Sequence, residues 1–561
     1  MIRLLAGLRT ICAAALIAAV AAIVAVAPTP AGAQGVRDVI IDQASVLQRF
    51  APPLRRPPTL GITLGKDVAG VPAAELARVR FTLRAVDLEG VESLDPARFA
   101  PLYAGLIGHE ITLLDLKTVT DGIERIYRDN DYFAAAAVPQ QDFASGRVRI
   151  IVYESYIRDV VIEGDVEGVR NLRERLQPYI DRMVEMRPVR VSKLIRYALL
   201  MTDLAGLTIN AEFSKIVDDP GAGLLVLTID FTPRSLRARL DNFADDDVGP
   251  LELAGNARFN NAFGLFEWTD GLVVTNPADP EELVVTKLGQ YVPLGPGGFA
   301  AGYDYGHVWS NPDHPADDPS IHAETSQANI YLNYAILRAI ERNLIGTVTL
   351  SGKDIAVDVD GNPVVRQRKR WISAGATYDD TILGVATLAN LELAQGIDAV
   401  DATGGNNDFT FATVDGQLSR DITETLSAKF LFTGQYAFNE LPTAVNFTLG
   451  GETFGRAFSN GALAGEDGYA VAYEMEQKLD LGIDWLTAFS LFGFVDYGAV
   501  WNAPGRGGYE YAAVGSAGGG FRARLGSHTM VSTWVAVPYK DDPKAGADGG
   551  AKVRFVAGVQ F

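Results

Sequence analysis

The sequence is almost without cysteine, and it has no long hydrophobic run beyond its first 33 residues. Its one cysteine, Cys12, lies in that leading stretch, so disulfides and thiol chemistry are not available to the rest of the chain. No later apolar segment approaches the roughly 18–20 residues of a membrane-spanning helix. Positive charge is also scarce, because 49 Lys and Arg against 69 Asp and Glu give a formal net charge of −20. Such a surface repels nucleic acid and argues against a DNA- or RNA-binding role.

Signatures of catalysis are missing as well. The chain contains no Walker A loop, no HExxH zinc motif and no GxSxG nucleophile elbow. Its five histidines lack tight metal-ligand spacing, and the Asp-rich stretches at 245–247 and 315–318 lack the spacing of a calcium loop. We therefore expect no enzyme activity, no catalytic residue, no cofactor and no metal. Without a nucleotide site, we expect no ATP-driven step by this chain.

The first 33 residues have the layout of a secretory signal peptide. Arg3 and Arg9 precede an apolar stretch from residue 11 to 26, and Ala31-Gly32-Ala33 forms a small-residue cleavage site. Cleavage after Ala33 would leave Gln34 first. Residues 34–75 then predict one amphipathic helix followed by a Pro-rich linker, with a frayed N-terminal arm as the alternative.

Two similar units come next. Val86-Asp-Leu-Glu-Gly90 recurs as Val160-Val-Ile-Glu-Gly164, and each copy predicts a short strand closed by a glycine turn. Two amphipathic helices and a strand pair follow each copy. Thr112 is a candidate N-cap, with Asp115 three residues on, and Ser192 is expected to open the last helix. Both units therefore predict the order β-α-α-β-β, an α+β arrangement.

The remainder of the chain alternates. From about residue 233, some 16 segments of roughly ten alternating residues follow one another, which is the length a tilted strand needs to cross a bilayer. The last segment, Lys552–Phe561, places Val553, Phe555, Ala557, Val559 and Phe561 on one face. Such an apolar edge invites aggregation in a soluble protein, whereas a closed barrel pairs it on both sides. A 16-stranded transmembrane β-barrel is predicted, with a large secreted β protein as the plainer alternative.

These patterns predict a division of the chain into five parts. They are a signal peptide (1–33), an N-terminal helix and linker (34–75), two α+β modules (76–155 and 156–232) and a barrel (233–561).

Several motifs resemble those of the two-partner secretion transporters, the haemolysin and filamentous-haemagglutinin secretion family. The string from Val138 to Val148, completed by Glu154, is similar to a motif of that family's first POTRA domain. Asp241-Asn242 and Tyr334–Arg338 match landmarks of its barrel, as do Arg342-Asn343-Leu344 and Leu449-Gly450-Gly451. The resemblance implies two POTRA domains followed by a 16-stranded outer-membrane barrel.

The resemblance also implies a conduction element. In the family a long loop re-enters the barrel with an Arg-Gly-aromatic tip, and here Arg456-Ala457-Phe458 stands at that position, with Ala in place of Gly. Ala tolerates positive φ poorly, which bears on the backbone at the tip. The family's partner strand resembles residues 491–498 and implies that Arg456 pairs with Asp496. A carboxylate facing lipid is costly, so Asp496 is expected in the lumen. Alternatively, Asp496 pairs with another wall arginine and Arg456 is solvated.

We therefore expect an outer-membrane translocator that binds an unfolded, β-helical adhesin- or cytolysin-type exoprotein through periplasmic POTRA domains and conducts it to the surface. Outer-membrane lipid and the barrel assembly machinery are the other expected partners, and Phe561 resembles the insertion signal of such barrels. The expected cargo-binding edge comprises Val138, Pro139, Gln140, Asp142, Val148 and Ile150. A row of Arg366, Arg368 and Arg370 suits a lumen lining, with a plain periplasmic turn as the alternative. An assembly factor of the same superfamily and a passive porin are the competing functions.

Overall fold

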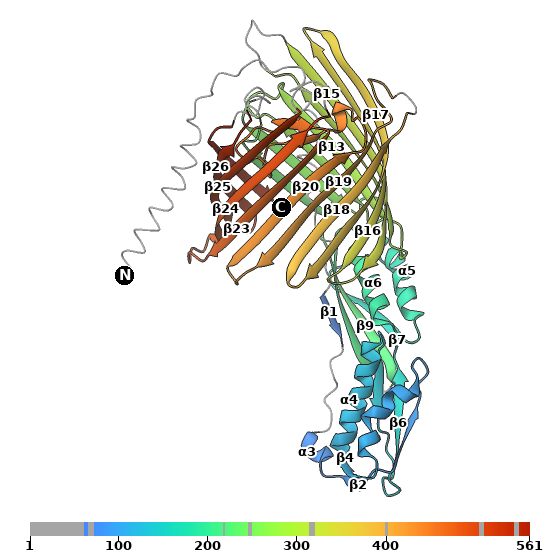
Figure 1. The fold of residues 1–561 in the computed structure, drawn as a ribbon. Coiled ribbons are helices and arrows are strands. Elements are labelled where there is room, and N and C mark those ends of the chain that lie inside the picture. The colour runs from blue at the N-terminus through green and yellow to red at the C-terminus, as the bar shows by residue number, and fades with distance from the viewer. Residues whose placement is uncertain are drawn as a thin grey trace, which may run out of the picture.

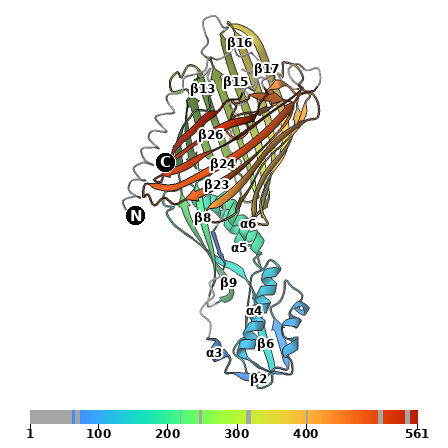
Figure 2. The same cartoon turned by 60° about the vertical axis from the view of Figure 1, so that its left-hand side comes forward.

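The computed structural model describes residues 61–64, 72–216, 219–244, 249–312, 320–398, 402–503, 510–542 and 549–561. Figures 1 and 2 show an elongated N-terminal arm of two α+β modules below a wide, tilted barrel. The expected signal peptide, N-terminal helix and most of the linker lie outside the described residues. Within the described residues, no helix is both long and apolar enough to cross a membrane.

The first module (β2 to β6) packs helices on one face of a small sheet. Its elements are β2 (Arg80–Thr82), β3 (Ala85–Glu89), η2 (Pro96–Leu102), η3 (Ala104–Leu106), β4 (Glu110–Thr112), α4 (Leu113–Asp129), β5 (Ala134–Ala137) and β6 (Arg147–Glu154), preceded by α3 (Ala73–Leu76). The main sheet has the order β3-β6-β5, and β2 pairs with β4. Buried Leu116, Ile123 and Tyr127 of α4 cover the sheet beside Val148 and Ile150 of β6.

Local sequence explains how the helices of this module begin. The Thr112 hydroxyl accepts the N–H of Asp115, and the Asp115 carboxylate accepts the N–H of Thr112, which confirms the predicted cap of α4. The expected first helix is the 3₁₀ helix η2, capped by Asp95. Pro101, inside this helix, accounts for the difference, because proline has no N–H to donate and disfavours the α conformation of the preceding residue.

The second module (β7 to β9) has two full α-helices. Its elements are β7 (Tyr156–Glu163), α5 (Leu172–Val184), α6 (Val191–Thr202), β8 (Leu207–Ile216) and β9 (Asp219–Phe231). Its sheet has the order β1-β8-β9-β7, because β1 (Gly61–Leu64) of the preceding linker adds in parallel to the edge of β8. The β-α-α-β-β order predicted for the repeated unit is confirmed here.

The two modules are joined by side chains of the segment that connects α4 to β5. The expectation that Ser192 opens the last helix is wrong, because α6 begins at Val191. The Ser192 hydroxyl instead donates to the carboxylate of Asp131 at 2.6 Å, across the module boundary. The Arg190 guanidinium lies over the ring of Tyr132, and Phe133 stacks on Phe213 of β8. These contacts fix one module against the other.

Sixteen antiparallel strands close the barrel in chain order, which confirms the predicted number. They are β10 (Arg234–Asp241), β11 (Glu252–Asn260), β12 (Trp268–Thr275), β13 (Leu283–Pro293), β14 (Phe299–Ser310), β15 (Ile321–Arg338), β16 (Asn343–Val359), β17 (Asn362–Ile382), β18 (Val385–Gly396), β19 (Thr410–Asp421), β20 (Leu426–Ala437), β23 (Asp467–Leu479), β24 (Leu486–Trp501), β25 (Tyr511–Leu525), β26 (Thr529–Lys540) and β27 (Lys552–Gln560). The closing seam pairs β10 with β27. The long strands β15, β16 and β17 rise above the other strands in Figure 1.

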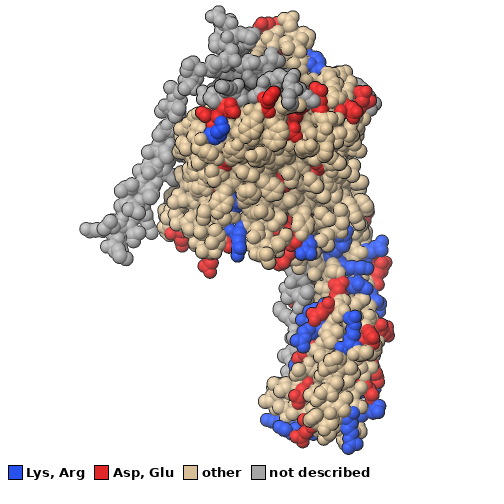
Figure 3. All heavy atoms as spheres, viewed as in Figure 1, with Lys and Arg blue, Asp and Glu red and all other residues tan. Residues whose placement is uncertain are grey.

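Alternation along the strands separates an apolar outer face from a polar lumen. Figure 3 shows a largely uncharged band across the face of the barrel in view, with charges gathered near its rims and over the arm. The expected lumen row of Arg366, Arg368 and Arg370 is wrong, because Lys369 and Trp371 of the same strand are the buried, inward residues. With a period of two, the arginines therefore point outward. There Arg366 and Arg370 pair with acidic residues of β16.

A buried ion pair fixes the arm to the barrel. Arg338, at the lower end of β15, donates to the Asp203 carboxylate after α6 at 2.8 and 3.1 Å. The Asn343 amide oxygen accepts from the same guanidinium at 2.9 Å. Burial raises the pKa of the Asp203 carboxyl, while Arg338 opposes that rise. The landmarks Tyr334–Arg338 and Arg342–Leu344 therefore lie where the second module meets the barrel.

Candidate functional site

A hairpin between β20 and β23 folds back into the barrel and carries the tip residues. Its strands are β21 (Phe447–Leu449) and β22 (Leu463–Gly465), and we call residues 446–466 the lumen loop. Gly450 and Gly451 turn the chain inward with φ of +118° and +117°, and a Cβ on Gly450 would lie 2.1 Å from the Ser459 carbonyl oxygen. Only glycine fits there.

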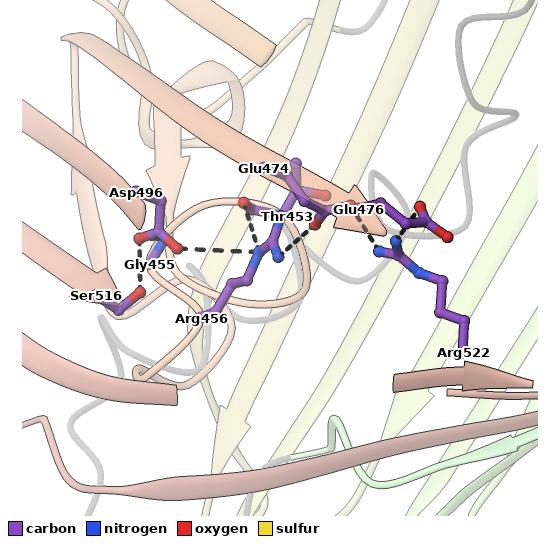
Figure 4. A network of polar contacts seen from close by, with 8 residues as sticks. All are labelled: Thr453, Gly455, Arg456, Glu474, Glu476, Asp496, Ser516 and Arg522. Carbon is purple, nitrogen blue, oxygen red and sulfur yellow. Dashed lines mark hydrogen bonds and ion pairs between the residues drawn. The ribbon is translucent and has the colours of Figure 1, made fainter. Parts of the chain in front are cut away.

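Arg456 at the tip of this loop is held by three groups. Its Nη1 donates to Glu474 Oε2 on β23 at 2.9 Å, and its Nε donates to the Thr453 carbonyl at 3.3 Å (Figure 4). Its guanidinium lies 4.1 Å from the centre of the Phe494 ring. The side chain is only 7% exposed, so its charge depends on these partners rather than on water.

Asp496 lies beside the same tip but binds it mainly through the backbone. Its Oδ1 accepts the N–H of Gly455 at 2.8 Å and the hydroxyl of Ser516 at 2.6 Å. Its Oδ2 lies 3.9 Å from Arg456 Nε, and no hydrogen bond to that oxygen is formed within the described residues. The structure thus brings Arg456 and Asp496 together as expected, but the nearest carboxylate to Arg456 is Glu474. Phe494 and Asp496 both face the lumen and are buried.

A second arginine repeats this arrangement one step along the wall. Arg522 of β25 donates to Glu474 Oε1 at 2.8 Å and to Glu476 Oε2 at 2.7 Å (Figure 4). Its guanidinium lies 3.9 Å from the centre of the Phe492 ring. Glu474 therefore sits between two guanidinium groups, one from the lumen loop and one from the wall.

The other side of the lumen loop contacts the closing seam. Glu452 accepts from Arg239 of β10 at 2.9 Å, and Ser459 accepts from Lys552 of β27 at 3.0 Å. The Asn460 amide donates to the carbonyl of Phe243, just after β10, at 2.6 Å. The loop therefore lies against the inner wall from β23 to β10 and touches both strands of the seam.

Asn242 extends the seam by means of its side chain. Where the β10–β27 ladder ends, the Asn242 amide donates to the carbonyl of Val553 and accepts the N–H of Phe555, both at 2.8 Å. One amide side chain thus supplies the donor and the acceptor that a further strand residue would have given. This contact explains the Asp241-Asn242 landmark.

Two loop segments are bound to the inner wall by buried lysines of β16 and β17. The buried Lys353 of β16 donates to the Ala444 carbonyl at 3.0 Å, and the buried Lys369 of β17 donates to Asn406 and Asn407 at 2.9 and 2.8 Å. The two lysines are directly opposite each other across β16 and β17. Among the described residues, no group of His, Cys, Asp and Glu is arranged to hold a metal ion.

Comparison with known proteins identifies this architecture. Residues 230–522 match the family model for the haemolysin secretion/activation proteins ShlB/FhaC/HecB, and residues 81–155 match the ShlB-type POTRA domain. The chain belongs to this family. The heme/hemopexin transporter protein HuxB of Haemophilus influenzae strain 86-028NP is 22% identical over 419 residues, which cover 71% of this chain and 72% of that protein. The resemblance read from the sequence is confirmed.

Solved structures agree on the fold. CdiB from Escherichia coli superposes with a TM-score of 0.72 at 19% identity, covering 95% of this chain and 100% of that one. CdiB from Acinetobacter baumannii gives 0.65 at 14% identity, with the same coverage. This chain is an outer-membrane β-barrel protein with periplasmic POTRA modules, and it is a translocator of the two-partner secretion type. The lower end of the barrel in Figure 1 is therefore periplasmic.

Ala457 fits the tip because the positive φ lies elsewhere. Gly455 has φ of +68°, whereas Ala457 is not among the residues with positive φ. Its methyl group is fully buried, and the adjacent Phe458 packs with Leu449 and Val514 in the same apolar cluster. The replacement of the family glycine by Ala therefore places no strained residue at the tip.

The first POTRA motif is structural in this protein. The Gln141 side chain accepts the N–H of Arg149 at 2.8 Å and donates to its carbonyl at 2.9 Å, so it pairs with β6 just beyond the end of β5. Asp142 accepts the N–H of Ala144 and shapes the following turn. Val138 packs against the module core. Pro139 and Gln140 continue the chain between these contacts.

The expected cargo edge at β6 needs correction. Val148 and Ile150 are fully buried, and β6 pairs with both β3 and β5, so it offers no free edge. On β5, the N–H of Ala136 already donates to Glu124. The strands that pair on one side only are β3 and β5 in the first module and β1 and β7 in the second, where β1 covers the edge of β8.

Glu154, which completes the motif, fastens the loop after β3. Burial disfavours its charge, but hydrogen bonds from the Ser93 hydroxyl, the Ser93 and Glu92 N–H groups and the Tyr127 hydroxyl outweigh burial and lower its pKa. Burial, and then the hydrogen bond to Glu154, raise the pKa of Tyr127. This carboxylate therefore stabilises the module when it is ionised.

Proposed function

We propose that the lumen loop is the element that must leave the wall for cargo to pass. The observation that supports this most directly is the Arg456 clamp, in which a buried guanidinium is held by Glu474, Thr453 and Phe494 on a hairpin inside the barrel. We call the loop docked when Arg456 is bound to the wall in this way. Because few partners hold the buried charge, the docked position is well defined, and the loop can leave the wall by breaking few contacts. Arg456, Phe458 and Asp496 are the proposed conduction residues.

The proposed cargo is an unfolded exoprotein that enters from the periplasm through the POTRA modules. Addition of a cargo strand to a sheet edge would use main-chain hydrogen bonds, which do not depend on cargo sequence. The edge strands β3, β5 and β7 support this mode, and a strand that added to β8 would first have to displace β1. We propose that the functional units follow the division into residues 76–155, 156–232 and 233–561, with Phe561 as the signal read during barrel assembly.

The test is secretion by an Arg456→Ala variant. Loss of the clamp should cut the amount of partner protein in the medium strongly, while heat-modifiable mobility in gels shows that the barrel still assembles. Arg524→Ala is the matched control, because Arg524 lies on the wall strand β25 and is exposed, and the one hydrogen bond of its side chain among the described residues is to the Met530 sulfur. Normal secretion by Arg456→Ala would show that the loop is not a conduction element.

A further inference from the structure

Arg522 occupies a position that the clamp itself does not require. Arg456 already has a carboxylate at 2.9 Å and an aromatic ring at 4.1 Å. Arg522 nevertheless reaches the same carboxylate from the other side, at 2.8 Å, and places its guanidinium on the ring two residues along β24. The two arginines differ in one respect, since Arg456 belongs to the lumen loop and Arg522 belongs to the wall.

This difference between the two arginines matters when the lumen loop leaves the wall, because Arg456 leaves with the loop. Glu474 is only 4% exposed, and a buried carboxylate without a cation is strongly disfavoured. If Arg456 were its one partner, undocking would strand this charge and the docked state would be hard to leave. Arg522 stays on β25 when the loop moves, and its second bond to Glu476 and its contact with Phe492 hold it in reach of Glu474.

The surrounding wall is built to keep Arg522 in place. Glu476 also accepts the hydroxyl of Ser490 at 2.5 Å, so its orientation is fixed. Gly518 and Gly520 face Phe494 and Phe492 across β24 and β25. The Phe492 ring, on which the Arg522 guanidinium lies, therefore has no side chain opposite it on β25.

We propose that Arg522 is a positioning residue that allows undocking, because it neutralises Glu474 after Arg456 has withdrawn. It would therefore weaken the hold of the wall on the loop rather than strengthen it. This inference rests on the proposed undocking of the loop during transport, but it concerns the docking equilibrium, which can be measured without cargo.

A buried thiol at the tip reports that equilibrium. Ala457 is fully buried, and Cys12 is the chain's one cysteine, so Ala457→Cys with Cys12→Ser gives a single reporter in the full-length protein. Its reaction rate with a membrane-impermeant maleimide measures how often the loop undocks. In this background Arg522→Gln should slow labelling several-fold, because Arg456 becomes the sole cation for Glu474. Labelling that is unchanged or faster would overturn the proposal, since a merely structural Arg522 would loosen the loop.

Two further variants make the result specific. With Glu474→Gln also present, Arg522→Gln should no longer slow labelling, because no buried charge remains to be stranded; slowing that persists would contradict the mechanism. Arg524→Gln removes an equal charge from the same strand and should leave labelling unchanged. Heat-modifiable mobility confirms that each barrel is folded. If the labelling rates change as expected but Arg456→Ala still secretes the partner normally, the proposed function fails and the role of Arg522 stands.

Discussion

Substitution of Gly455 tests whether the backbone of the tip, and not its charge alone, sets the docked state. Gly455 has φ of +68°, and its N–H donates to Asp496 Oδ1 at 2.8 Å. An alanine in the left-handed region costs about 1–2 kcal/mol. Its Cβ would also lie 3.2 Å from Gly450 Cα, closer than most such contacts. Gly455→Ala should therefore raise the undocked population by roughly 5- to 30-fold, since 1.4 kcal/mol is a factor of ten.

Gly482 supplies the matched control for this strain. It has φ of +62° in the turn between β23 and β24, and a Cβ there would meet nothing within 4 Å. Gly482→Ala therefore carries a similar backbone penalty away from the lumen loop. In the Ala457→Cys reporter, Gly455→Ala should label roughly 5- to 30-fold faster, whereas Gly482→Ala should label at the parent rate. Equal rates for the two variants would refute the reasoning, because strain at the tip would then have no specific effect on docking.

Two further predictions concern the arm. Arg338→Met removes the cation that pairs with Asp203. Breaking a fully buried pair costs about 3–5 kcal/mol, and the cost here should be smaller because the Asp203 side chain is 23% exposed. Thermal unfolding of the POTRA region in the detergent-solubilised protein should begin at a lower temperature, and an unchanged transition would show that the pair does not fix the junction. Glu154 has a lowered folded-state pKa, so its stabilising effect is complete above the ordinary value near 4.5 and is lost as the pH falls through the folded value. Glu154→Gln should thus weaken the first module at neutral pH and flatten its acid unfolding curve, and an unaltered curve would contradict this role.

The larger architecture could be predicted from the sequence because it depends on periodicity. The alternating segments after residue 233 required a closed barrel, and sixteen strands close it. The repeated Val-x-x-Glu-Gly segments indicated two similar modules. Each segment lies on an edge strand of its sheet, the first on β3 and the second on β7. The order of strands within each sheet was less accessible. Nothing local shows that β6 lies between β3 and β5, so the expectation of a free edge at Val148 and Ile150 is wrong, whereas β5 is an edge strand.

The amide contacts depend on tertiary register and left no local signal of their role. Gln141 pairs with Arg149 only because β5 stops four residues earlier, at Ala137, while β6 continues. Asn242 pairs with Val553 and Phe555 only because the first and last barrel strands meet at the seam. The family motifs marked both positions without showing that each amide substitutes for a missing strand residue.

The carboxylates of the clamp could have been found by the argument already used for Asp496. Glu474 and Glu476 share one parity on β23, which is one of the alternating segments, and a pair of carboxylates facing lipid would be as costly as Asp496 there. That argument places both in the lumen, opposite Phe494 and Phe492, where an arginine of the loop would meet Glu474 first. Arg522 is different, because its contact with Glu474 spans β24 and needs the register of three strands. The sequence could therefore have predicted Glu474 and Glu476 as the carboxylates of the clamp. The contact of Arg522 with Glu474 could be found only in the closed barrel.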